Sequence, residues 1–149
     1  MRKWFAGAVI YKWENELLYL LVQTSRSVDW RYSSLPPQVK FPGGTNIGHP
    51  EDGGPVDTLK REVKEETGMR LDAPKYLCDL PENRDGIRRW FYLSAIEDCV
   101  GELRREEILD GSDILSSPYW VRVDHLSRML FRTHLIPLRR AIRYFGLVG

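Results

Sequence analysis

Three glutamates lie close together in the segment Arg-Glu-Val-Lys-Glu-Glu-Thr-Gly of residues 61–68. In a helix, at about 100° per residue, Glu62, Glu65 and Glu66 would fall within one arc of roughly 100°. This grouping opposes helix stability, because like charges four residues apart repel and acids near the C-terminal end interact unfavourably with the helix dipole. Several carboxylates without His or Cys are ligands that suit Mg²⁺ or Mn²⁺. The pattern indicates a metal-assisted phosphoryl site, with a solvated charged face as the simpler alternative.

Two neighbouring features favour the metal site. Val56, Leu59 and Val63 fall on an adjacent arc that we expect to pack on a sheet, which would place the acids at the edge of that contact. Gly43 and Gly44 follow a short predicted strand, at residues 38–42, where bare backbone could approach an oxyanion. The acids and the glycines would then share one cleft.

At this spacing the residues resemble the box of the Nudix hydrolases. In that box a glycine, five residues, a glutamate and seven residues precede Arg-Glu-apolar-any-Glu-Glu-any-Gly-apolar. The positions that match its second half are Arg61, Glu62, Val63, Glu65, Glu66, Gly68 and Met69. The run Phe41-Pro42-Gly43-Gly44 resembles the usual lead-in to the box.

The first half of the box departs from the pattern. Sixteen residues separate Gly44 from Arg61, where the box has thirteen, and Gly53 holds the place of the first glutamate. Either Glu51 or Asp52 could restore that carboxylate from the lengthened loop. The departure leaves the substrate class open.

The resemblance implies hydrolysis of a nucleoside diphosphate linked to another group, with Mg²⁺ or Mn²⁺ as the cofactor. Glu62, Glu65 and Glu66 would hold the metal, which would lower the pKa of a bound water that attacks phosphorus. Arg61 would pair with a neighbouring carboxylate and fix its orientation. We expect Glu65→Gln or Glu66→Gln to abolish Mg²⁺-dependent hydrolysis without disturbing the fold.

The sequence offers three candidates for the general base. Glu62 is one candidate, and Glu106 and Glu107 are others, because the family often supplies an acid from that region. The candidate catalytic residues are therefore Glu62, Glu65, Arg61, Glu106 and Glu107.

Substrate contacts are predicted at the glycines and in a long loop at residues 25–37. Gly43 and Gly44 would lie close to phosphate or metal. Arg26, Trp30 and Arg31 combine an aromatic face with positive charge, which suits a base and a phosphate. In addition, Trp90 and Phe91 lie on opposite sides of one predicted strand, so one of them could face the cleft. We interpret His49 as an exposed polar residue, and His125 and His134 as structural.

The elements that must position these residues can be read from periodicity and turn chemistry. Alternation predicts strands at residues 4–13 and 17–24, which form a hairpin about a polar turn, and further strands at 75–80, 87–96 and 119–123. The acidic helix should begin at Pro55 and end at Thr67, with Gly68 as a left-handed cap. A helical region at 125–145, capped by Asp124, should break near Pro137. This order predicts an α/β fold: one Nudix-like domain over residues 1–149, an α/β/α sandwich with a mixed central sheet.

Composition limits the remaining functions. The net charge of +1 offers no basic surface for specific nucleic-acid binding, so we expect a small nucleotide as the partner. No apolar run suits a membrane span or a signal peptide, which predicts no membrane partner and a cytoplasmic protein. Because many members of the family are dimers, a homodimer stays open. Cys78 and Cys99 are expected to be buried small hydrophobes.

Three alternatives stay open at this point. Within the enzymes, the same box serves nucleoside triphosphate pyrophosphohydrolases and dinucleoside polyphosphate hydrolases. Outside them, a nucleotide-binding regulatory module could keep the fold and lose catalysis. A scaffold with an acidic helix is the third alternative, and it would bind no stoichiometric Mg²⁺ or Mn²⁺.

Overall fold

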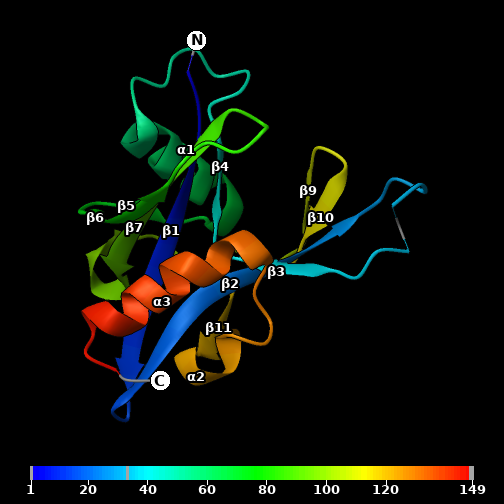
Figure 1. Cartoon of the computed structure of the whole chain (residues 1–149). Coiled ribbons are helices and arrows are strands. Elements are labelled where there is room, and N and C mark those ends of the chain that lie inside the picture. The colour runs from blue at the N-terminus through cyan, green and yellow to red at the C-terminus, as the bar shows by residue number, and fades with distance from the viewer. Residues whose placement is uncertain (1, 33, 148–149) are drawn as a thin grey trace.

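The computed structural model describes residues 2–32 and 34–147 (Figure 1). Its first two strands, β1 (Lys3–Glu14) and β2 (Leu17–Ser27), form the predicted antiparallel hairpin. The turn consists of Asn15 (φ 52°) and Glu16 (φ 65°), both in the left-handed region. Two such residues are typical of the tight turn whose twist matches that of the flanking strands.

A mixed sheet forms the centre of the molecule. In the described residues it has nine strands, six of them in the order β6-β7-β1-β2-β10-β9. β1 runs parallel to β7, and every other recorded pairing within this sheet is antiparallel. The bounds of its remaining strands are β3 Gln38–Lys40, β4 Gly43–Thr45, β6 Lys75–Leu80, β7 Ile87–Ala95, β9 Ile108–Asp110, β10 Asp113–Leu115 and β11 Tyr119–Arg122. β3 and β11 pair with β2, and β4 pairs with β1. A separate small sheet pairs β5 (Arg70–Leu71) with β8 (Cys99–Val100).

Helix α1 (Pro55–Thr67) covers one face of the sheet and has the predicted bounds. Leu59 and Val63 are fully buried in an apolar cluster with the alanines of β1. Gly68 ends the helix at φ 85°, and a Cβ there would lie 2.7 Å from the carbonyl oxygen of Glu102. Val56 differs from the expectation: it is 36% exposed, because it lies in the first turn, at the margin of the helix–sheet contact.

The opposite face carries the C-terminal helices α2 (Val123–Leu126) and α3 (Leu135–Tyr144). Figure 1 shows α3 lying across β1. Leu126 and Leu138 are buried there in a second apolar cluster with residues of β1 and β2. Helices therefore cover both faces, which confirms the predicted α/β/α architecture with a mixed sheet. None of the helices in the described ranges is long and apolar enough to cross a bilayer.

Strand bounds differ from the expectation near the cleft. β2 continues to Ser27 because its last residues pair with β3 and β10, so the loop predicted from Ser25 begins later. The strand predicted at residues 38–42 is β3, which ends at Lys40, so Gly43 and Gly44 do not directly follow it. They lie within β4, where they pair with Gly7 and Ala6 of β1.

The C-terminal helical region also differs. Asp124 lies inside α2, whose cap position is Arg122, so its predicted capping role is wrong. The break spans residues 127–134 and includes a 3₁₀ turn at Arg132–His134 (η2). Pro137 instead lies in the first turn of α3, where its missing N–H has no helical partner to lose.

Candidate functional site

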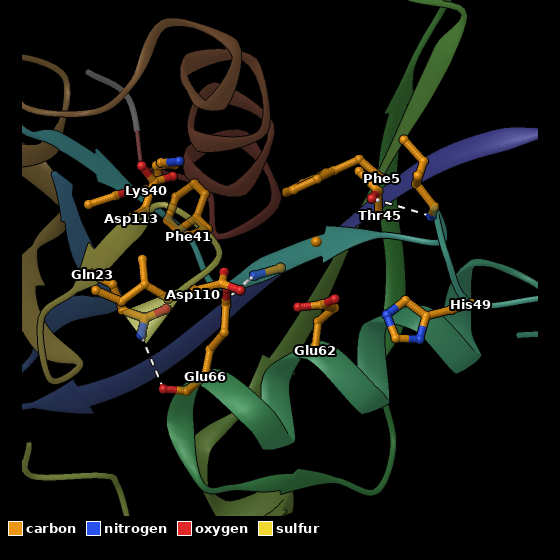
Figure 2. A pocket seen from close by; sticks show the side chains of 15 residues that line it. Phe5, Gln23, Lys40, Phe41, Thr45, His49, Glu62, Glu66, Asp110 and Asp113 are labelled. Atoms are coloured by element: carbon orange, nitrogen blue, oxygen red, sulfur yellow. Dashed lines mark hydrogen bonds between the residues drawn. The ribbon is translucent and has the colours of Figure 1, made fainter. Parts of the chain in front are cut away.

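A cavity of about 400 Å³ lies between α1, β4 and the hairpin of β9 and β10. Figure 2 shows Glu62 and Glu66 pointing into it from α1. Asp110 and Asp113 line it from the hairpin, and Lys40 lines it from β3. The cavity thus gathers four acids and one cation, an excess of negative charge that a bound cation would relieve.

Glu66 is the most buried of these acids, with only 6% of the residue exposed. Its Oε1 accepts a hydrogen bond of 2.8 Å from the backbone N–H of Gly43. Burial raises the pKa of Glu66 to about 8; the Gly43 N–H opposes this shift, and the charges of Glu62 and Asp110 add to it. A carboxylate in these surroundings is costly without a counter-cation.

The backbone of Glu66 is held from two directions as well. Its carbonyl oxygen accepts hydrogen bonds from Gln23 Nε2 at 3.1 Å and from Arg104 Nε at 2.8 Å. Because Gln23 belongs to β2 and Arg104 follows β8, these contacts tie the end of α1 to the sheet. Hydrogen bonds therefore hold Glu66 both at its backbone carbonyl and at its side-chain carboxylate.

Glu62 lies against the bare backbone of Gly44. A Cβ at Gly44 would come within 2.6 and 2.7 Å of the two carboxylate oxygens, so any side chain there would displace the Glu62 carboxylate. Arg61 Nη1 donates to Glu62 Oε1 at 2.8 Å. Burial raises the pKa of Glu62, and Arg61 opposes that shift.

Arg61 also anchors the lengthened loop. Its guanidinium donates to both oxygens of Asp52, at 2.8 and 3.3 Å, and to the carbonyl oxygen of Thr45 at 3.1 Å. The Asp52 side chain is 4% exposed, accepts a further bond from Thr58 Oγ1, and has a lowered pKa, mainly because of Arg61. Glu51 instead pairs with His49. Of the two acids that the sequence left open, Asp52 is the one that meets Arg61.

The predicted acids outside the helix do not reach the cavity. Glu106 and Glu107 are exposed, and Glu107 lies 3.8 Å from Arg26. Glu65 does not line the cavity either: its side chain is 56% exposed, 3.7 Å from Arg61 Nη1.

Sequence reasoning missed Asp110 and Asp113 because it predicted no strands at 108–115. A signal was present: Gly111-Ser112 separates Asp110 from Asp113, and Gly-Ser is a two-residue turn pattern of β-hairpins. Gly111 has φ 61°, as a turn of this kind requires.

The substrate-binding residues predicted in the long loop lie beside the cavity rather than in it. Arg26 and Tyr32 line a neighbouring cavity of about 320 Å³, which shares Ser25 and Asp113 with the first. Figure 1 shows why: β2 and β3 leave the sheet as an arm that carries this loop outward.

Trp30 and Arg31 lie further along the same arm. Trp30 is 83% exposed, and Arg31 pairs with Asp29 at 2.7 Å. Neither residue is among those that line the two cavities.

Neither Trp90 nor Phe91 of β7 lines the cavity, which corrects the expectation that one of them could face it. Phe91 is fully buried in the apolar cluster under α3, and Trp90 lies on the other face of the sheet, beside α1. His134 is buried, and its Nδ1 accepts a hydrogen bond from the backbone N–H of Phe41, in keeping with a structural role.

The donor set fits a hard divalent cation that a substrate helps to hold. Within the described ranges, no three His, Cys, Asp or Glu side chains converge closely enough to form a metal site by themselves. Mg²⁺ commonly takes only one or two protein carboxylates and leaves the remaining positions to water and phosphate. Glu62 and Glu66, two like-charged carboxylates in one cavity, supply that number of ligands.

Comparison with known proteins identifies the family of the chain. A family model described as NUDIX domain matches residues 1–145. No curated protein matches the sequence closely enough to count as a relative.

Solved structures resemble the chain at low identity. The MutT NUDIX hydrolase of Burkholderia pseudomallei superposes with a TM-score of 0.65 and 20% identity, over 94% of this chain and 98% of that one. The NUDIX domain of Shewanella oneidensis NrtR, solved with ADP ribose, gives 0.69 and 16%, over 97% and 89%. NrtR solved with a 27mer DNA gives 0.64 and 19%, over 95% of this chain and 61% of that one. At these low identities, the similarity to the solved structures shows a shared fold.

Proposed function

Because the chain belongs to the NUDIX domain family, we propose that it hydrolyses a diphosphate bond in a nucleoside diphosphate linked to another group. The observation that carries this proposal is the cavity in which Glu62 and Glu66 of α1 face Asp110 of β9. A diphosphate can enter such a cavity only if its own charge and that of the acids are neutralised. A divalent cation shared by acids and phosphates does both.

We assign the metal, Mg²⁺ or Mn²⁺, to Glu62 and Glu66, with Glu65 as a further carboxylate at the rim. The metal would supply charge neutralisation and a bound water of lowered pKa. Arg61 orients Glu62, and the Gly43 N–H orients Glu66. In this assignment the two glycines of β4 do not contact the substrate. Gly43 positions the Glu66 carboxylate, and Gly44 leaves room for the Glu62 carboxylate.

Asp110 is the best placed acid for proton transfer. It reaches the cavity from the wall opposite α1, and Figure 2 shows its side chain next to Glu66. A carboxylate there can accept a proton from a water that attacks phosphorus, a role worth about 10²–10⁴-fold in rate. Glu106 and Glu107 would have to move into the cavity to serve in its place. Lys40 is the cation in the lining and can pair with a phosphate oxygen.

A substrate panel tests the proposed activity. Nucleoside diphosphate sugars, nucleoside triphosphates and dinucleoside polyphosphates are incubated with Mg²⁺ or Mn²⁺, and the products are separated by ion-exchange chromatography. We expect a nucleoside monophosphate and the phosphorylated second group from a diphosphate-linked substrate. Pyrophosphate from a triphosphate would instead identify a nucleoside triphosphate pyrophosphohydrolase. A panel without any turnover would contradict hydrolysis.

A regulatory module is the alternative from another class. This alternative is considered because NrtR, which shares the fold, has been solved in complex with a 27mer DNA. Calorimetry separates the two functions: a binding module holds the nucleotide at equal affinity with and without metal, and releases no product. The acids of the cavity favour the enzyme, because they repel a nucleotide unless a cation is present.

Location and assembly stay predictions for this protein. We keep a cytoplasmic location and a homodimer as open expectations. Sedimentation equilibrium at several concentrations measures the assembly state directly.

A further inference from the structure

A second cavity, of about 760 Å³, lies at the N-terminal end of α1. Its lining includes Trp4 of β1, Trp90 of β7 and the backbone of residues 53–55. It shares no lining residue with the acidic cavity. The loop of residues 46–54 separates the two, because Ile47 and His49 line the first and Gly53 and Gly54 line the second.

Both indoles in this cavity are held in place by the protein. Trp4 Nε1 donates to Thr58 Oγ1 at 2.8 Å, and the Trp4 backbone N–H donates to Asn46 Oδ1 at 2.9 Å. The ring of Trp90 meets Tyr76 edge-on, with ring centres 6.2 Å apart, and Arg88 Cζ lies 5.3 Å from its centre. Aromatic walls that are fixed in advance bind a planar ligand without an ordering cost.

The charge around these indoles is mainly positive. Arg2, Lys3 and Arg88 line the cavity, and Glu82 is the acid in its lining. Arg88 is partly neutralised by its ion pair with Asp79. Neither Arg2 nor Lys3 has an ion-pair partner in the part of the chain that the structure describes, so both can receive an anion.

We propose that this cavity binds a nucleoside monophosphate. The planar base suits the tryptophan rings, since nucleic-acid bases stack on aromatic side chains whatever their identity. The phosphate suits the basic rim, where Arg2 and Lys3 supply donors and charge. The volume is within the range of roughly 300–1,000 Å³ that is usual for small-molecule sites. The site is independent of the proposed hydrolysis, because it requires neither the acids nor a metal.

Gly54 offers a test that leaves the fold intact. Its backbone is extended (φ −177°, ψ 179°), which any residue adopts, and a Cβ there would meet no atom within 4 Å. It is the N-cap residue of α1, where Asp and Asn are both favourable. Gly54→Asp and Gly54→Asn therefore make a matched pair that differs by one negative charge beside the cavity.

The experiment is calorimetry in EDTA with the four common ribonucleoside monophosphates and with inorganic phosphate. The protein carries its tag at the C-terminal end, because Arg2, Lys3 and Trp4 line the cavity. We expect one monophosphate per chain, bound with unchanged affinity in Glu66→Gln, and at least about tenfold weaker binding of phosphate alone. Gly54→Asp should weaken binding about tenfold relative to Gly54→Asn, and added salt should weaken it further.

Three results would overturn the site. They are no binding by any of the four nucleotides, binding that is lost in Glu66→Gln, and equal affinity in Gly54→Asp and Gly54→Asn. Thermal melts of both Gly54 variants show that each is folded. Hydrolysis in the substrate panel is scored separately, so a failure here does not affect the proposed function, and the reverse also holds.

Discussion

At the scale of single residues, the three glutamates of α1 lie at three depths. Glu66 is buried, Glu62 is partly buried against Gly44, and Glu65 is exposed. Depth determines how much each carboxylate depends on a cation, because burial penalises charge that nothing compensates. We therefore expect Glu66 to be the acid that the activity tolerates least when it is changed.

Glu66→Gln should reduce kcat with Mg²⁺ by more than about 100-fold, since even residues behind a metal ligand cost 10–100-fold. The amide can still accept the hydrogen bond from Gly43, so the fold should persist. Steady-state kinetics and circular dichroism measure the two effects. Glu65→Gln tests the sequence prediction for the neighbouring acid, and we expect a smaller loss because that side chain is exposed. Full activity in Glu66→Gln would refute the assignment.

Gly44→Ala should reduce kcat about 10²-fold, because the new Cβ displaces the Glu62 carboxylate and small displacements of catalytic groups have effects of this size. Gly54→Asn is the control, since its Cβ meets no atom within 4 Å and Asn is favourable at the N-cap of α1. Rates of the two variants under identical conditions check the prediction. Equal rates would show that the contact between Gly44 and Glu62 does not matter.

At the scale of elements, the lengthened loop is fastened to α1 by the carboxylate of Asp52. Arg61 and Thr58, both on the helix, donate to this nearly buried side chain. The same guanidinium holds Glu62, so the position of the loop and the orientation of a candidate metal ligand are coupled. Three additional residues in this loop are therefore compatible with an intact carboxylate helix.

Asp52→Asn should destabilise the fold by about 1–3 kcal/mol, because a buried arginine contact loses its charge partner. It should also lower kcat, because Arg61 loses the contact that positions it against Glu62. Urea unfolding and kinetics give both numbers. Glu51→Gln, one residue away on the surface, should change neither; if it matches Asp52→Asn, the difference drawn between the two acids is incorrect.

His134 joins β3, β4 and α3 through the aromatic cluster around Phe41. Burial lowers its pKa to about 3, and the charges of Lys40 and Arg89 contribute to the shift. The unfolded chain binds this proton near pH 6.5 and the folded chain does not, so the fold loses stability as pH falls below about 6.5. Above that pH both states leave the imidazole neutral and the effect vanishes.

Between about pH 7.5 and pH 5, His134 should therefore cost about 2 kcal/mol of unfolding free energy. His134→Gln removes this dependence, and comparison with the unchanged protein cancels contributions from carboxyl groups. Urea unfolding at both pH values measures it. His125→Gln, an exposed histidine, is the control and should keep the original slope. A slope that persists in His134→Gln would disprove the assignment.

At the scale of the whole molecule, two apolar clusters hold helices on opposite faces of one sheet. The acidic cavity opens where β4, β3 and the β9–β10 hairpin meet the C-terminal half of α1, and the second cavity opens at the other end of the same helix. One helix thus has an acidic environment at one end and a basic, aromatic one at the other. This polarity separates the proposed cation site from the proposed anion site.

Divalent cations should stabilise the whole fold. An ion that binds only the folded chain raises the unfolding free energy by about 1.4 kcal/mol at ten times its Kd. Urea unfolding with Mg²⁺ or Mn²⁺, against NaCl at equal ionic strength, measures this. Glu66→Gln should lose most of the effect. Identical curves with and without divalent ions would contradict the metal assignment.

The parts of the structure that the sequence predicted are those governed by local rules. The bounds of α1 follow from Pro55 and Gly68, and the hairpin turn follows from polar residues between two alternating strands. The grouping of the glutamates follows from helical geometry alone. Each of these depends on residues only a few positions apart, so it can be read from the chain in order.

The features that only the folded chain shows depend on contacts between residues far apart in the sequence. Asp110 enters the cavity only because β10 pairs with the end of β2, and Asp52, rather than Glu51, meets Arg61 because of how the loop folds back on α1. The different burial of Glu62, Glu65 and Glu66 depends on which of them face β4. The sequence alone determined a carboxylate helix in a mixed α/β fold; the contacts that complete its site required the folded chain, because they join segments whose separation no local pattern records.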